Sequence, residues 1–185
     1  KNFEKAIELD PKNSLAYNNK GTALTNVGKF EQAIECFNMA ITLEPEVAQP
    51  YNNKGITLSQ IGQYQSSIFY FNKAIDLEPN LAQAYNNKGI SLGELMKFDQ
   101  AIECYEKAMK LDPHKKNIYT NKINEIKTEL SNLNQKTKNQ VTKIKIDEII
   151  SLINPPAKNA KVTDNDLVDL LQYYDLINEL ETVNG

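Results

Sequence analysis

The chain has 185 residues, of which 41% are hydrophobic and 24% charged, a balance typical of a globular protein rather than a disordered one. Its 21 cationic residues are all lysines, so the composition excludes sites that need the forked guanidinium group of arginine. Its 24 acidic residues bring the net charge to −3, which gives no overall attraction to nucleic-acid phosphates. No apolar run approaches the roughly 18 residues of a membrane-spanning helix. We therefore expect no nucleic-acid partner and no membrane span.

The cysteine content bears on the cellular compartment. Cys36 and Cys104 are the only cysteines, and two are too few to staple a chain of this size. The sequence also contains no Asn-x-Ser/Thr acceptor site for glycosylation. We expect both thiols to be free and buried, and the protein to be cytoplasmic.

A period of 34 residues dominates the sequence. The string YNNKG stands at residues 17–21, 51–55 and 85–89. Within each unit, apolar residues recur at helical spacing in two runs that are separated by a short break. Each unit is therefore predicted to form a pair of helices joined by a tight turn.

Glycines and prolines mark the ends of these predicted helices. Gly28 and Gly62 suit the left-handed residue that follows the first helix of a pair. The second helix should end before Pro45, Pro79 or Pro113, because proline cannot continue a helix.

A second set of glycines lies inside the first helix of each pair, at Gly21, Gly55 and Gly89. Glycine costs a helix interior about 1 kcal/mol relative to alanine, so each of these positions should permit a contact that a larger residue would prevent. We expect close approach of the two helices of a pair at these glycines.

The 34-residue period, an aromatic residue four positions before the inner glycine, and the terminal proline together resemble the tetratricopeptide repeat family over residues 1–138. The resemblance implies an all-α fold, a right-handed solenoid of helical hairpins with a capping helix and a helical C-terminal extension. The expected divisions are the end of a preceding repeat at 1–13, repeats at 14–47, 48–81 and 82–115, a capping helix at 116–138, and the extension at 139–185.

The capping helix continues the period only in part, since Ile123 stands where the next glycine is expected. The last unit of a solenoid needs a polar outer face, and we expect this face to consist of Lys122, Glu125, Lys127, Glu129 and Asn132.

The extension has a different composition from the repeats. Residues 139–185 hold 4 lysines and 8 acidic residues, so they carry all of the net negative charge. We expect a helix over Val141–Ile153 and an amphipathic helix over 164–182. Because a lone amphipathic helix is marginal in water, the second helix should dock within the chain or mediate dimerisation.

No arrangement of residues points to catalysis. The single histidine, His114, follows a proline in an expected loop and has no nucleophile or acid at a suggestive spacing. Phosphate-binding loops and metal-ligand clusters are absent from the sequence pattern. We therefore expect a protein that is not an enzyme and that takes no cofactor and no metal.

The first helix of each repeat carries the most informative residues. The resemblance implies that these helices line a concave groove, where asparagines recur at every repeat as a ladder of amides. An amide offers two donors and an acceptor, which suits the backbone of an extended peptide, although the same asparagines could instead hold neighbouring helices together. The candidate peptide-binding residues are Asn18, Asn19, Thr22, Asn52, Asn53, Ile56, Asn86, Asn87, Ile90 and Asn121.

Other positions argue against a second binding mode of the family, the clamp for the acidic tails of chaperones. That clamp needs cations where this chain has Asn18, Gln83 and Asn87. A column of lysines does recur at Lys20, Lys54, Lys88 and Lys122, and we expect their stems to pack and their ammonium groups to reach solvent.

The middle repeat departs from its neighbours at Phe69 and Tyr70, which stand where the other repeats have glutamate and cysteine. An aromatic in place of a solvated residue suggests a covered surface.

These observations favour a non-catalytic scaffold that binds an extended peptide in the groove. Two alternatives stay open: a regulatory or targeting region of a larger enzyme, and a self-association module that acts through the C-terminal helices.

Overall fold

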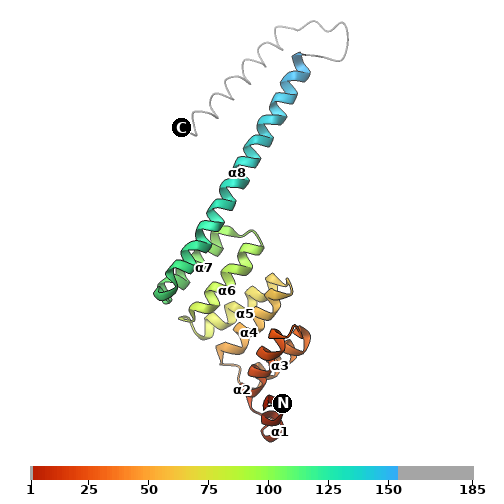
Figure 1. Ribbon diagram of the computed structural model, residues 1–185, viewed down its shortest axis with the longest axis vertical. Coiled ribbons are helices and arrows are strands. Elements are labelled where there is room, and N and C mark those ends of the chain that lie inside the picture. The colour runs from red at the N-terminus through yellow and green to blue at the C-terminus, as the bar shows by residue number, and fades with distance from the viewer. Residues whose placement is uncertain (1, 154–185) are drawn as a thin grey trace. The chain divides into compact units, whose positions relative to one another are not determined.

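The computed structural model describes residues 2–153, and all regular structure in that range is helical (Figure 1). The elements in chain order are α1 (Asn2–Leu9), α2 (Ser14–Asn26), α3 (Phe30–Leu43), α4 (Ala48–Gln60), α5 (Tyr64–Leu77), α6 (Ala82–Glu94), α7 (Phe98–Leu111), a 3-10 turn at Pro113–Lys115 and α8 (Lys116–Ile153).

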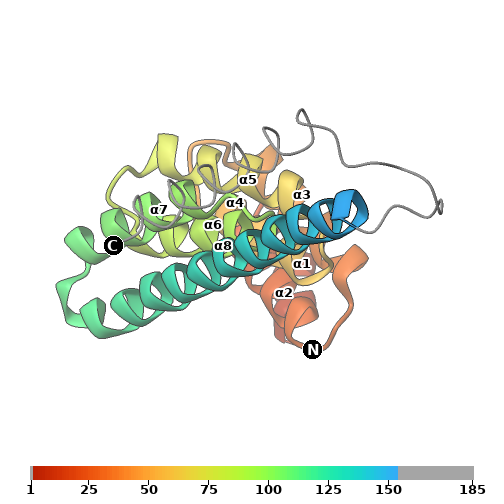
Figure 2. The ribbon, with the colours of Figure 1, turned by 90° about the horizontal axis from the view of Figure 1, so that it is seen from above.

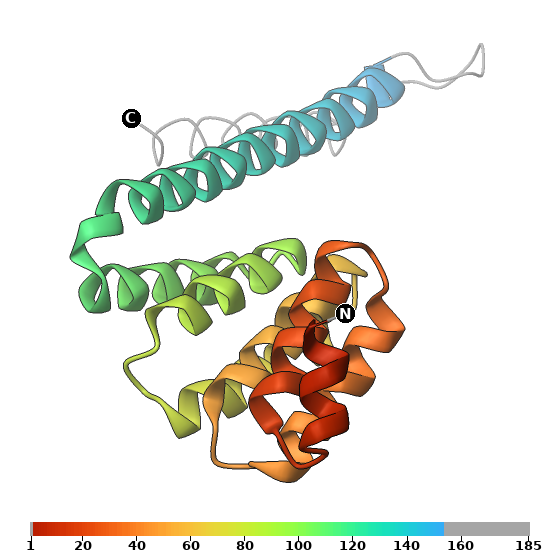
Figure 3. The same cartoon turned by 60° about the horizontal axis from the view of Figure 1, so that its bottom comes forward.

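Consecutive helices pair as antiparallel hairpins, α2 with α3, α4 with α5 and α6 with α7, and the hairpins stack on one another (Figure 3). The first helices α2, α4 and α6 also contact one another in that order. The chain forms two compact units, residues 1–130 and 131–185, and this stack belongs to the first. The all-α hairpin solenoid expected from the sequence is thus confirmed.

The turn inside each hairpin is the one that the glycines predict. Gly28 and Gly62 adopt positive φ angles of 74° and 76°, and the residue after each glycine closes the turn by donating its backbone N–H back to a carbonyl near the end of the first helix. The third hairpin makes the same turn with Met96 at φ 57°, a conformation that is strained for a residue with a side chain.

The second helices end two residues before their prolines, at Leu43, Leu77 and Leu111. The backbone has left the helical region just before each proline, as in Glu44 with φ −137° and ψ 81°, because the proline ring disfavours a helical residue ahead of it.

The inner glycines mark the closest helix contacts in each hairpin. A Cβ atom built on Gly21, Gly55 or Gly89 would lie 2.6–2.8 Å from the ring of an aromatic residue on the partner helix. These aromatic residues, Phe37, Phe71 and Tyr105, are almost completely buried. The close approach expected at these glycines is therefore present.

The first four turns of α8 cover the end of the stack within the first unit. Tyr119, Ile123 and Ile126 are buried in the same cluster as Phe98 and Tyr105 of α7. Ile123 fills this core with its own side chain, so α8 packs without the glycine-to-aromatic contact of the repeats.

Figure 2 shows α8 as one uninterrupted helix that passes through the boundary expected at residue 138. No glycine or proline interrupts residues 116–153, and the flanking prolines, Pro113 and Pro155, lie outside this range. The helix expected over Val141–Ile153 is thus the last part of α8, whereas the helix expected over 164–182 lies outside the described residues. Nowhere in the described part of the chain is a helix both long and apolar enough to cross a membrane.

Candidate functional site

Three pockets open in a row along the first helices of the stack. The first pocket lies between α2 and α4 and has a volume of about 200 Å³, the second lies between α4 and α6 with about 210 Å³, and the third lies between α6 and α8 with about 360 Å³. Neighbouring pockets share a wall, Ile56 between the first two and Ile90 between the last two. The three pockets therefore form one groove, and all of its lining residues belong to the first unit.

The pockets are built from equivalent positions of the repeat. Phe37, Phe71 and Tyr105 each line one pocket, so the aromatic side chain that packs on the inner glycine also forms part of the pocket wall. The position five residues after that glycine contributes Asn26, Gln60 and Glu94 to successive pockets. The architecture of the pockets repeats, whereas their chemistry does not.

In the first two repeats, the first asparagine of the pair lies inside the contact between repeats. Asn18 is 6% exposed and Asn52 is fully buried. Asn53 Nδ2 donates to Asn18 Oδ1 at 3.0 Å, and Asn87 Nδ2 donates to Asn52 Oδ1 at 3.2 Å. These two asparagines thus tie neighbouring first helices together, and Asn52 has no surface on which a peptide could lie.

The second asparagine of each pair lies closer to the groove. Asn53 lines the first pocket and Asn87 the second, alongside Thr22, Ile56 and Ile90. All five of these residues are among those that the sequence selected.

The remaining candidates fall elsewhere. Asn19 and Asn121 are exposed but line none of these pockets, and Asn86 is half-buried, where it donates to Asn87 Oδ1 at 3.1 Å.

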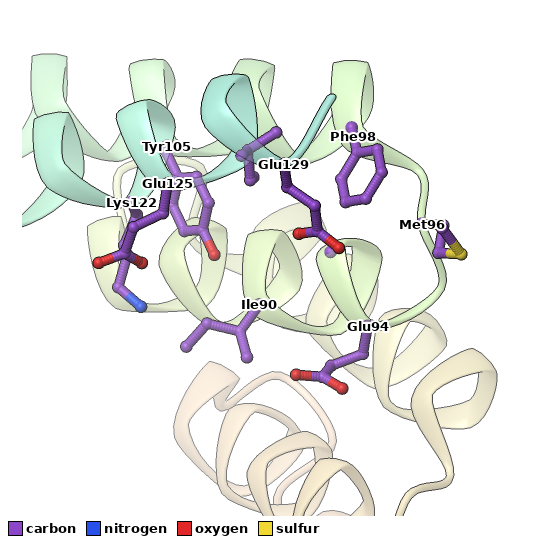
Figure 4. Close-up of a pocket in the computed structure, with 10 residues that line it drawn as sticks. Ile90, Glu94, Met96, Phe98, Tyr105, Lys122, Glu125 and Glu129 are labelled. Atoms are coloured by element: carbon purple, nitrogen blue, oxygen red, sulfur yellow. The ribbon is translucent and has the colours of Figure 1, made fainter. Parts of the chain in front are cut away.

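The third pocket contains charged residues that the sequence analysis assigned to a solvated outer face. Lys122, Glu125 and Glu129 of α8 line this pocket together with Glu94 of α6 (Figure 4). Glu125 and Glu129 are exposed, as expected for a solvated face, while Lys122 is half-buried, and periodicity alone does not show that this side of α8 also lines a pocket. Two signals in the sequence set this pocket apart: Tyr105, where the other repeats have phenylalanine, and Glu94, where they have an amide.

Tyr105 is 4% exposed and forms a wall of the third pocket. Burial raises the pKa of its phenol to about 12, with the neighbouring Cys104, Glu125 and Glu94 adding to the effect. The Lys122 ammonium lies 5.5 Å from the centre of the Tyr105 ring. At neutral pH the phenol is therefore protonated and can donate a hydrogen bond.

The lysine column differs from expectation at Lys54, which is only 8% exposed. Its ammonium donates to Asn38 Oδ1 at 2.6 Å and to the Tyr70 hydroxyl at 2.7 Å, and lies 4.0 Å from the centre of the Tyr70 ring. Tyr70 thus covers a lysine that would otherwise reach solvent, which explains its presence in the middle repeat. Phe69 packs edge-on against Tyr70 and remains 55% exposed.

The two cysteines are free and buried, as expected. Burial is the main cause that raises the pKa of each thiol, which keeps both in the unreactive protonated form at neutral pH. His114 is exposed in the 3-10 turn, and over the part of the chain that the structure describes no group of three potential ligands is arranged to hold a metal ion.

The family model "Tetratricopeptide repeat" matches the chain at residues 14–47, 48–81 and 82–115. The matched residues make up more than half of the sequence, so the chain belongs to the tetratricopeptide repeat family. No curated protein matches the chain.

Solved structures of this family have the same fold. The first tetratricopeptide repeat domain of Spaghetti (RPAP3), bound to the HSP90 peptide SRMEEVD, is 23% identical, with a TM-score of 0.62 over 66% of this chain and 96% of that one. A solution structure of the first such domain of human RPAP3 is 23% identical, with a TM-score of 0.62 over 64% and 93%. The repeat domain of Arabidopsis OM64 is 20% identical, with a TM-score of 0.58 over 60% and 94%.

Proposed function

We propose that this protein is a non-catalytic scaffold whose groove binds an extended segment of a partner protein. The observation that carries the proposal is the row of three pockets with shared walls, one at each junction between first helices. Packed helices lie about 8–10 Å apart and an extended chain rises about 3.3 Å per residue, so neighbouring pockets suit side chains roughly three residues apart. A row of pockets at this spacing favours an extended peptide over a compact ligand.

The amides beside the pockets have hydrogen-bonding capacity left for such a peptide. Asn87 uses one of its two amide hydrogens on Asn52, and its oxygen accepts one bond from Asn86, which leaves one donor and one acceptor site. Asn53 gives its donors to Asn18 and Thr22 and keeps one acceptor site, because its oxygen accepts only from Gln49. Asn87 is thus the best placed amide for contact with a peptide backbone.

The structure of RPAP3 with its HSP90 peptide offers a related domain in which a peptide is bound. That peptide, SRMEEVD, is acidic at its end, whereas the positions that would have to be cationic here are Asn18, Gln83 and Asn87. We therefore propose a different kind of peptide for this chain.

The proposal is tested by selecting peptides for the full chain from an array of random heptapeptides with acetylated and amidated ends. The affinity of selected peptides is then measured by calorimetry for the native chain and for the double variant Ile56→Ala/Ile90→Ala. Each truncation removes a shared apolar wall, and about 1–2 kcal/mol of contact energy corresponds to a loss of about tenfold in affinity.

A matched control is Ile34→Ala/Ile75→Ala, since both isoleucines are half-buried on second helices and line none of the three pockets. If no peptide is selected, or if both double variants lose the same affinity at equal folded fraction, the groove is not the binding site.

A further inference from the structure

The groove changes its chemistry along its length although its architecture repeats. The residue five positions after the inner glycine is Asn26 in the first pocket, Gln60 in the first and second, and Glu94 in the third. Neutral amides and hydroxyls thus line the first pocket, isoleucines flank the second, and carboxylates line the third. A peptide that fills the groove must match this gradient from neutral to acidic.

The third pocket holds an excess of negative charge. Three carboxylates line it, those of Glu94, Glu125 and Glu129, against the single ammonium of Lys122. Between residues 3 and 145, where side chains are described, the ion pairs are Lys20 with Glu4 and Lys115 with Asp112, so none of the three carboxylates has an ionic partner. Among the described residues, these carboxylates included, no group of three is arranged to hold a metal ion.

An independent observation points to a ligand in the same pocket. The Tyr105 side chain is only 4% exposed, yet its hydroxyl forms no hydrogen bond with any described residue. Figure 4 shows the hydroxyl directed into the pocket on the side of Ile90. The equivalent residues Phe37 and Phe71 have no hydroxyl, so of the three pockets only the one with the carboxylates has a hydroxyl at this position of the repeat.

Apolar side chains complete the third pocket. Ile90, Met96, Phe98 and Ile126 line it together with the carboxylates. Lysine and arginine side chains combine an aliphatic stem with a cationic end, which matches apolar walls beneath acidic groups.

We infer that the third pocket binds a lysine or arginine side chain of the partner peptide, with its stem against Ile90 and Ile126 and its cationic end among Glu94, Glu125 and Glu129. The inference rests on the proposed function and adds the chemical class of the peptide. The neighbouring second pocket, with Ile56, Phe71 and Ile90, takes an aliphatic side chain about three residues away. The Tyr105 hydroxyl donates a hydrogen bond to a backbone carbonyl of the same peptide.

The peptides selected on the random array provide the test. They should be enriched in lysine or arginine about three residues from an isoleucine, leucine or valine. For the tightest peptide, replacing its basic residue with norleucine, which keeps the stem without the charge, should weaken binding to the native chain about tenfold or more.

The double variant Glu125→Gln/Glu129→Gln keeps the shape of the pocket and should bind the basic and norleucine peptides almost equally. The control Glu103→Gln/Glu106→Gln changes two exposed glutamates of α7 outside the groove and should keep the native preference. Selection of peptides without basic residues, or an unchanged preference in Glu125→Gln/Glu129→Gln, overturns the inference and leaves the groove proposal standing. If the array gives no binder at all, the groove proposal itself is overturned.

Discussion

Three side-chain contacts of the same kind set the spacing of the hairpins. Gly21, Gly55 and Gly89 each face an aromatic ring that has almost no exposed surface. The absence of a Cβ lets the ring lie against the helix backbone, and the aromatic ring then forms the wall of a groove pocket on its other side. One residue type thus links the packing of the hairpin to the shape of the groove.

Gly55→Ala should destabilise the protein by about 1–3 kcal/mol, because the new Cβ would lie 2.6 Å from Phe71 in a well-packed core. Gly93→Ala is the matched control, since this glycine is also in a first helix but has no atom within 4 Å of the Cβ position. There the better helix propensity of alanine should stabilise the protein by up to about 1 kcal/mol. Urea unfolding of both variants checks the difference, and equal effects would contradict the packing argument.

At the scale of the helix, amides and hydroxyls hold the first helices to one another. Besides the asparagine pairs, Thr25 and Thr57 share a hydrogen bond of 2.8 Å, and Ser91 donates to Ser59 at 3.2 Å. Each of these bonds joins equivalent faces of neighbouring first helices. The groove therefore has a floor whose polar groups are largely paired within the protein, and that pairing keeps its walls in register.

Asn52→Ala should lower the free energy of unfolding by about 1–3 kcal/mol, because Asn87 would lose its acceptor inside a buried junction. Asn19→Ala, at the exposed neighbouring position of the previous repeat, should change stability by less than about 0.5 kcal/mol. Chemical denaturation compares the two variants. Similar losses in both would show that the junction bond contributes little.

At the scale of the whole molecule, the two compact units differ in what their side chains contact. The first unit contains clusters of buried hydrophobic side chains, whereas residues 131–144 of the second are all exposed, including Val141 at 44% and Ile144 at 52%. The sequence places its predicted amphipathic helix, 164–182, in the same unit. We expect that helix to cover apolar surface, since alone it would be marginally stable.

The full chain and a chain truncated after residue 154 should both be monomers, because we expect the helix predicted over 164–182 to dock within its own chain. The truncated chain should then show faster amide exchange across residues 116–153. Light scattering and hydrogen exchange measured on both chains check this. A dimeric full chain beside a monomeric truncated chain would instead indicate self-association. If both chains are monomers with the same amide exchange, the helix docks neither on its own chain nor on a second copy.

The sequence alone determined the hairpins, their turns and their ends. Gly28, Gly62 and Pro45 act within a few residues of themselves, so local sequence was enough to predict the turns and the helix ends. The close approach at Gly55 was predicted as well, but that its partner is the Phe71 ring was not. The sequence also selected Thr22, Ile56 and Ile90, because its resemblance to the tetratricopeptide repeat family implied which face of the first helices lines the groove.

The tertiary structure alone decided which polar residues face the groove. Spacing shows that Asn18 and Asn19 lie on neighbouring faces of one helix, but the next helix determines which of them is covered, and it covers Asn18. The same holds for Glu125 and Glu129, which line a pocket only because α8 packs with that side toward α6. Burial depends on contacts between segments that are distant in sequence, and a local sequence pattern does not contain information about these contacts.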